Sequence, residues 1–120
     1  MRISAGRRWL LPVGAAVCLI ALTWAIQAQN TQTFTGVITD SMCPNGDHSH
    51  MQMGPNDGEC TKACVLEHGA TYVLFDGKNA YDLSDQMTPE KFAGQKVTVK
   101  GTVDAKTKTI EVASMSAAAK

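Results

Sequence analysis

Between Gln95 and Val103 the sequence shows its clearest two-residue period, and this pattern restricts the possible folds more than any other segment. Val97 and Val99 alternate with Thr98 and Lys100. Successive side chains of a β-strand point to opposite faces, so this pattern predicts a strand with one face buried and the other in water. The segment is too short and too regular in its two-residue period for an amphipathic helix.

Four further segments have the composition of short strands, and turn residues such as Asp76-Gly77 separate two of them. These segments are Thr33–Asp40, Thr71–Phe75, Ala80–Leu83 and Thr109–Met115. Gly36 lies inside the first of them and predicts a bend or a close approach of another backbone. Five short strands favour a mainly β domain, a small five-stranded barrel resembling the oligonucleotide/oligosaccharide-binding (OB) fold.

Two short helices are expected between the strands. Asp57 as N-cap and Gly69 as terminator bound a helix over Glu59–His68. Thr88-Pro89-Glu90 opens a second helix, with proline at its first position. A helix before the fourth strand matches the OB-like layout, whereas a helix between the first two strands departs from it. An open antiparallel α+β sheet is therefore the alternative fold.

The N-terminus has the layout of a secretory signal peptide. Met1–Arg8 is basic, Trp9–Ile26 carries no charge, and small residues end at Ala28. This pattern predicts a signal peptide over residues 1–28, cleaved near Ala28. An uncleaved membrane anchor is the alternative, because 18 apolar residues just reach the length that spans a bilayer.

The rest of the chain is expected to form one domain over residues 29–116, followed by a disordered tail over 117–120. It would lie in the bacterial periplasm or be secreted, with membrane contact only through the signal segment. From Gln29 onward there are 8 lysines, 11 acidic residues and no arginine. Nucleic acid is excluded as a partner, because affinity for it comes mainly from cationic contacts. A small ligand or an envelope protein remains the expected partner.

The segment Asp40–His68 is unusually rich in cysteine, histidine and methionine. It contains every cysteine and histidine found after Gln29, together with three methionines. Thiolate and imidazole groups bind zinc, and thioethers shift the preference toward Cu(I). The candidate ligands of a zinc or copper ion are Cys43, Cys60, Cys64, His48, His50 and His68.

The spacing of these residues limits how they can share an ion. Cys60, Cys64 and His68 recur every four residues, so adjacent members share a helix face while all three span about 12 Å. The remaining ligands would come from Cys43 and from His48 or His50. The alternative is a disulfide from Cys43 to Cys60 or Cys64, with one spare thiol.

Enzymatic chemistry has weaker support. Cys60 would lie near a helix N-terminus, which lowers a thiol pKa, but Asp57 and Glu59 oppose that effect and there is no C-x2-C motif. Thiol-redox activity is thus the leading enzymatic alternative to a non-enzymatic protein. Asp40 is interpreted as a turn residue at a strand end.

Several motifs together resemble a known family. GVITDSMC (Gly36–Cys43), C-x3-CV (Cys60–Val65), GATYVLFDGK (Gly69–Lys78) and FAGQKVTVKGTVD (Phe92–Asp104) are similar to a family of small exported bacterial proteins catalogued as a domain of unknown function. The resemblance covers nearly all of the chain after the signal segment. It implies one small β-rich domain with three marked cysteines, and no particular reaction.

The sequence therefore predicts an exported, non-enzymatic domain with a Cys/His site for a transition metal. A disulfide-stapled binding or envelope-stress module without metal is the alternative.

Overall fold

The computed structural model describes residues 30–119. The predicted signal peptide over 1–28 lies outside these residues, as does Cys18. None of the helices within 30–119 has the length and apolar character needed to cross a membrane.

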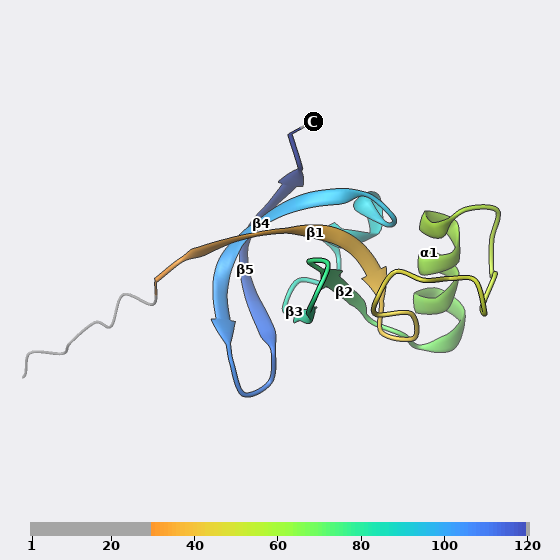
Figure 1. Ribbon diagram of the computed structural model, residues 1–120, viewed down its shortest axis with the longest axis horizontal. Coiled ribbons are helices and arrows are strands. Elements are labelled where there is room, and N and C mark those ends of the chain that lie inside the picture. Colours follow the sequence, from red (N-terminus) through yellow and green to blue (C-terminus); the bar gives the residue numbers. More distant parts are fainter. Residues whose placement is uncertain (1–29, 120) are drawn as a thin grey trace, which may run out of the picture.

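Five strands close into a barrel with the neighbour order β1-β2-β3-β5-β4, and β4 returns to pair with β1 (Figure 1). The strands are β1 (Gln32–Asp40), β2 (Tyr72–Phe75), β3 (Ala80–Leu83), β4 (Lys96–Asp104) and β5 (Thr109–Ala117). All pairs are antiparallel except β3 with β5. The predicted five-stranded OB-like barrel is confirmed. The open sheet is wrong, because the long strand β1 pairs on both of its sides and closes the ring.

Strand β1 closes the ring, and its pairings with β4 and β2 meet next to Gly36. Its first half pairs with β4, and its second half pairs with β2 from Val37 to Asp40. A Cβ atom at Gly36 would lie 2.3 Å from the carbonyl oxygen of Phe75, so the backbones meet there as closely as glycine allows. The close approach predicted at Gly36 is confirmed.

The barrel interior is filled by apolar side chains from all five strands and from Ala93, which follows the short helix. These buried residues are Ile38, Tyr72, Leu74, Leu83, Ala93, Val97, Val99 and Ile110. Strand β5 runs to Ala117 and the Ala118 amide donates to the Lys96 carbonyl, so pairing continues past the predicted strand end at Met115.

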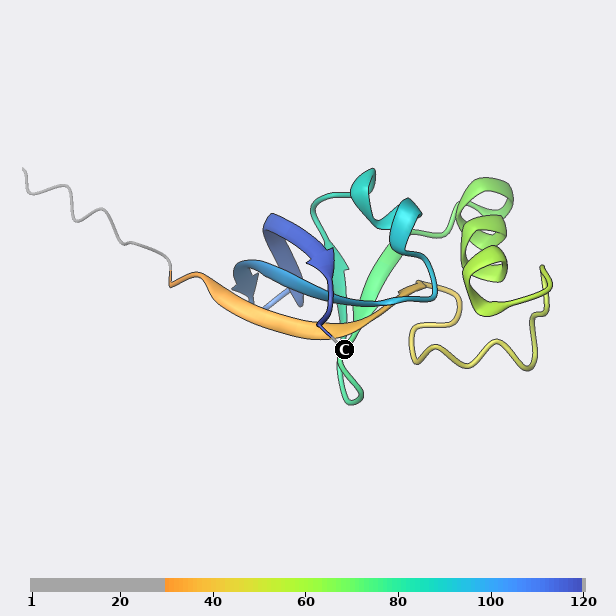
Figure 2. The same ribbon diagram turned by 90° about the horizontal axis from the view of Figure 1, so that it is seen from above.

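Helix α1 (Asp57–His68) stands beside one end of the barrel, with the loop 41–56 running along it (Figures 1 and 2). It begins two residues earlier than predicted, because the side chain of Asn56, not Asp57, caps it by accepting from the Glu59 amide. Gly69 ends it in the left-handed conformation, as predicted. The second helix is a 3-10 helix, η1 (Thr88–Phe92).

The first turn of α1 rests directly on the backbone that links η1 to β4. A Cβ atom on Gly58 would lie 2.6 Å from the Ala93 carbonyl oxygen, and one on Gly94 would lie 2.7 Å from the Gly58 nitrogen. Two glycines thus let the helix approach the barrel closely. This contact brings the buried face of α1, which carries Cys60, Thr61 and Cys64, against the end of β1 and the loop that follows it.

Candidate metal centre

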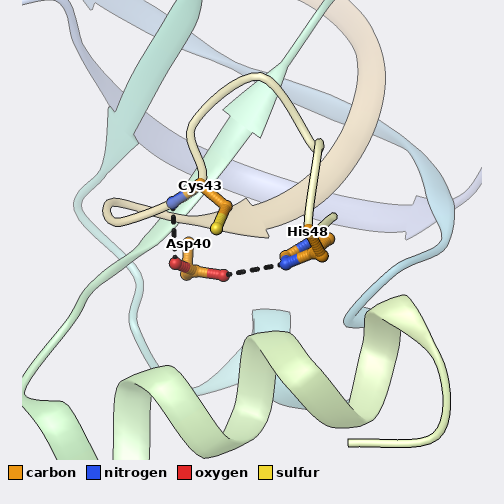
Figure 3. Close-up of side chains that lie close together, drawn as sticks. All are labelled: Asp40, Cys43 and His48. Carbon is orange, nitrogen blue, oxygen red and sulfur yellow. Dashed lines mark hydrogen bonds and ion pairs between the residues drawn. The ribbon is translucent and has the colours of Figure 1, made fainter. Parts of the chain in front are cut away.

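Three potential ligands converge where β1 ends. Asp40 is the last residue of β1, and Cys43 and His48 lie in the loop that follows. All three are buried, and one ligand atom from each lies within 4.8 Å of the other two. Figure 3 shows the Cys43 sulfur pointing toward the space between the Asp40 carboxylate and the His48 ring. An oxygen, a sulfur and a nitrogen donor are therefore placed around one point.

The two oxygens of Asp40 have different surroundings. Oδ1 accepts hydrogen bonds from the Met42 and Cys43 amides, each at 3.0 Å, and so builds the tight turn after β1. Oδ2 is buried and has no hydrogen-bond partner among residues 30–119. The interpretation of Asp40 as a turn residue is confirmed, but the turn uses only Oδ1 and leaves Oδ2 without a role.

The His48 ring is likewise engaged on one side only. Its Nε2 atom lies 3.3 Å from the Thr39 hydroxyl of β1 and 3.4 Å from the Thr61 hydroxyl of α1. Its Nδ1 atom is buried, has no hydrogen-bond partner in the described part of the chain, and lies 3.9 Å from Asp40 Oδ2. Two unsatisfied buried atoms thus face each other, an arrangement that is costly unless a cation or another polar partner lies between them.

Two more thiols border this group from α1. Cys60 donates to the Met51 carbonyl oxygen at 2.7 Å and accepts from the Met53 amide at 3.4 Å. Cys64 has no exposed surface. Within residues 30–119 all three cysteines are free thiols. Cys60 and Cys64 are not members of the 4.8 Å group.

The thiols of Cys43 and Cys64 are held in their neutral form. Burial, then the Asp40 carboxylate, raises the pKa of the Cys43 thiol. Burial followed by Asp40, Cys60 and Cys43 raises the pKa of the Cys64 thiol to about 11. Metal binding to either residue would release a proton, because the thiolate is the ligand.

The remaining predicted ligands lie elsewhere. His50 is exposed in the loop, and His68 is exposed at the last residue of α1. Neither belongs to the 4.8 Å group. Asp40 was not among the predicted ligands, although its position offered a signal: it follows Ile38 by two residues and so shares the inward phase of the strand.

The chain matches no protein-family model, no curated protein and no solved structure. The group formed by Asp40, Cys43 and His48 is therefore a candidate metal centre on the basis of its donor atoms and their burial.

The raised pKa of Cys64 predicts a loss of stability in alkali for the metal-free protein. The unfolded chain loses the thiol proton near the ordinary value of 9.0, whereas the folded chain keeps it to about 11. The contribution of Cys64 to the free energy of unfolding should therefore be constant below pH 9 and fall by on the order of 2 kcal/mol as the pH rises from 9 to 11. Urea unfolding at a series of pH values measures this. Cys64→Ala should flatten the decline, and an equal decline in both proteins would contradict the prediction.

Proposed function

We propose that this protein is an exported, non-enzymatic domain that binds one transition-metal ion through Asp40, Cys43 and His48. The observation that carries the proposal is the pair of unsatisfied buried atoms, Asp40 Oδ2 and His48 Nδ1, beside the Cys43 thiol. A metal ion would satisfy all three groups at once. Carboxylate, thiolate and imidazole are each ordinary zinc ligands.

The distances suit a metal better than a direct ion pair. At 3.9 Å, the separation of Asp40 Oδ2 from His48 Nδ1 is too long for a hydrogen bond. Ligand atoms at about 2.0–2.3 Å from a tetrahedral zinc lie about 3.5 Å from one another. Asp40 Oδ2 and His48 Nδ1 would therefore have to close by only about 0.4 Å to share an ion, whereas a direct hydrogen bond between them would require nearly an ångström. The Cys43 sulfur lies within 4.8 Å of one ligand atom of each residue and would have to move closer as well.

The proposal assigns Cys64 as the fourth ligand, which requires α1 to move toward the group, because Cys64 lies outside the 4.8 Å set. It lies on the buried face of α1, and both Asp40 and Cys43 are close enough to raise the pKa of its thiol. The Cys60 thiol is the less suitable ligand, because it already bonds to the Met51 carbonyl and the Met53 amide. An ion held by Cys64 together with Asp40, Cys43 and His48 would join α1 to the end of β1 and to the loop that follows it.

Zinc is favoured over copper by the donor set. A carboxylate oxygen is a poor partner for Cu(I), which prefers thiolates and thioethers. The thioether side chains of Met42 and Met53 are 42% and 37% exposed, so they lie at the surface. The alternative of a disulfide-stapled module has less support, because the three cysteines within residues 30–119 are free thiols. The signal-like N-terminus and the resemblance to a family of small exported proteins support export.

Native mass spectrometry of the purified protein with excess zinc, and separately with Cu(I), tests this proposal. One zinc ion per chain is expected, and Cys43→Ser and His48→Gln should each abolish the adduct. His50→Gln is the matched control, since it changes an exposed loop histidine and should leave the zinc in place. A denatured mass lacking two hydrogens, with no adduct in the native state, would show a disulfide and contradict the proposal.

A further inference from the structure

Thr39 lies beneath the proposed metal site and contacts two of its ligands. Its side chain is on β1 and is 1% exposed. The hydroxyl lies 2.7 Å from the Cys43 carbonyl oxygen and 3.3 Å from His48 Nε2. One small side chain therefore touches the residue that supplies the sulfur ligand and the residue that supplies the nitrogen ligand.

The direction of these two hydrogen bonds follows from a count of protons. A hydroxyl group has one proton to donate, and a carbonyl oxygen can only accept. The 2.7 Å contact thus uses the Thr39 proton. Toward His48, the Thr39 oxygen can only accept, so the hydrogen must be on Nε2. A neutral imidazole carries one N–H, and Nδ1 is then left with its lone pair.

The geometry points to Thr39 as a positioning residue that holds His48 in the Nε2–H form, with Nδ1 as the metal-binding nitrogen. This inference rests on the proposed function, because it assigns the atom through which His48 would bind the ion. It agrees with the general design of metal sites, in which the second ring nitrogen of a histidine ligand donates to a neighbouring acceptor. The Nδ1 atom that it assigns is the one that is buried without a partner.

Thr61 provides a matched comparison on the other side of the ring. Its hydroxyl lies 3.4 Å from the same Nε2 atom, and it is fully buried on α1. Without a carbonyl acceptor among residues 30–119 comparable to that of Thr39, the Thr61 hydroxyl could donate or accept, so this contact does not itself assign the tautomer. Once the hydrogen is on Nε2, Thr61 can only accept a share of it. Thr61 can therefore support the ring without selecting its tautomer.

Nitrogen-15 NMR of the imidazole rings in the metal-free protein at pH 8 tests this assignment, because neutral tautomers have distinct nitrogen shifts. In the unmodified protein, His48 should be Nε2–H alone. Thr39→Val keeps the branched shape but removes the hydroxyl, and it should give a mixture of tautomers. Zinc affinity should fall about 10–100-fold, as for other residues that orient a ligand. Thr39→Ser should restore both properties, and Thr61→Val should keep the single tautomer.

Two results would overturn the inference. One is an Nδ1–H tautomer of His48 in the unmodified protein, which can be observed even if Thr39→Val fails to fold. The other is a Thr39→Val protein with a single Nε2–H tautomer and unchanged zinc affinity. Failure of the proposed function is distinguishable from both, since absence of zinc binding by the unmodified protein leaves the tautomer measurement intact. On zinc addition, the Nδ1 resonance of His48 should shift more than that of Nε2.

Discussion

Zinc is expected to raise the melting temperature of this protein by about 10–20 °C when its free concentration is about a hundred times the dissociation constant. A ligand that binds only the folded state at that excess adds about 2.7 kcal/mol to the free energy of unfolding. In a domain of this size each kcal/mol shifts the melting temperature by about 4–8 °C. Zinc should bind only the folded state, because Asp40, Cys43 and His48 come together only when the loop 41–56 is folded over the end of β1. Circular dichroism or differential scanning calorimetry measures the shift.

One cysteine variant and one histidine variant separate zinc stabilisation through this site from general metal binding. Cys43→Ser should remove most of the zinc-dependent shift, whereas His50→Gln should retain it, because His50 is exposed and outside the 4.8 Å group. Mg²⁺ should have no effect, since it avoids thiolate ligands. If zinc stabilised Cys43→Ser as strongly as the unmodified protein, the stabilising site would lie elsewhere.

Gly36→Ala should reduce the free energy of unfolding by about 2–4 kcal/mol, which lowers the melting temperature by roughly 10–25 °C. The added Cβ atom would lie 2.3 Å from the Phe75 carbonyl oxygen, 2.8 Å from the Phe75 carbonyl carbon and 3.0 Å from the Asp76 Cα atom. All three are backbone atoms, so none can turn aside as a flexible side chain would. Strand β1 would have to move away from β2 at the point where the barrel closes. Urea unfolding measures the loss.

The neighbouring position provides the control for Gly36. Thr35 lies on the same strand, is exposed and pairs with Thr98 of β4. Thr35→Ala should change the free energy of unfolding by no more than about 0.5 kcal/mol, as is usual for surface substitutions. A Gly36→Ala protein as stable as Thr35→Ala would mean that the barrel can open at this contact without cost.

Local patterns of the sequence predict most of the fold. The alternation around Val97 and Val99 gives the inward face of β4, and both side chains are fully buried. Gly69 ends α1 because its left-handed conformation, at φ 69°, is unstrained only for glycine. The bounds of β3 agree with the prediction, and those of the other strands differ by one or two residues. These features depend on residues a few positions apart, so they can be predicted from the sequence alone.

The candidate site could be predicted only in part. The density of cysteine and histidine between Asp40 and His68 indicated metal chemistry and included Cys43 and His48. It also included His50 and His68, which the structure places outside the group. Helical spacing connects Cys60 with Cys64, but it says nothing about how the loop reaches the helix. The loop 41–56 has no periodicity, so the direction of each of its side chains is undetermined by local pattern.

Local sequence specifies the alternating strands, the helix ends and the supply of donor atoms, because each depends on the chemistry of neighbouring residues. Which of the donor atoms lie close together depends on how the chain packs in three dimensions. The turn built by Asp40 brings Cys43 and His48 back to the end of β1, and the docking of α1 through Gly58 and Gly94 places Thr61 against the His48 ring. That convergence leaves Asp40 Oδ2 and His48 Nδ1 buried and facing each other. Such a pair of atoms comes together only where several elements pack around the same point. For that reason the local sequence pattern could not predict that these two atoms would face each other.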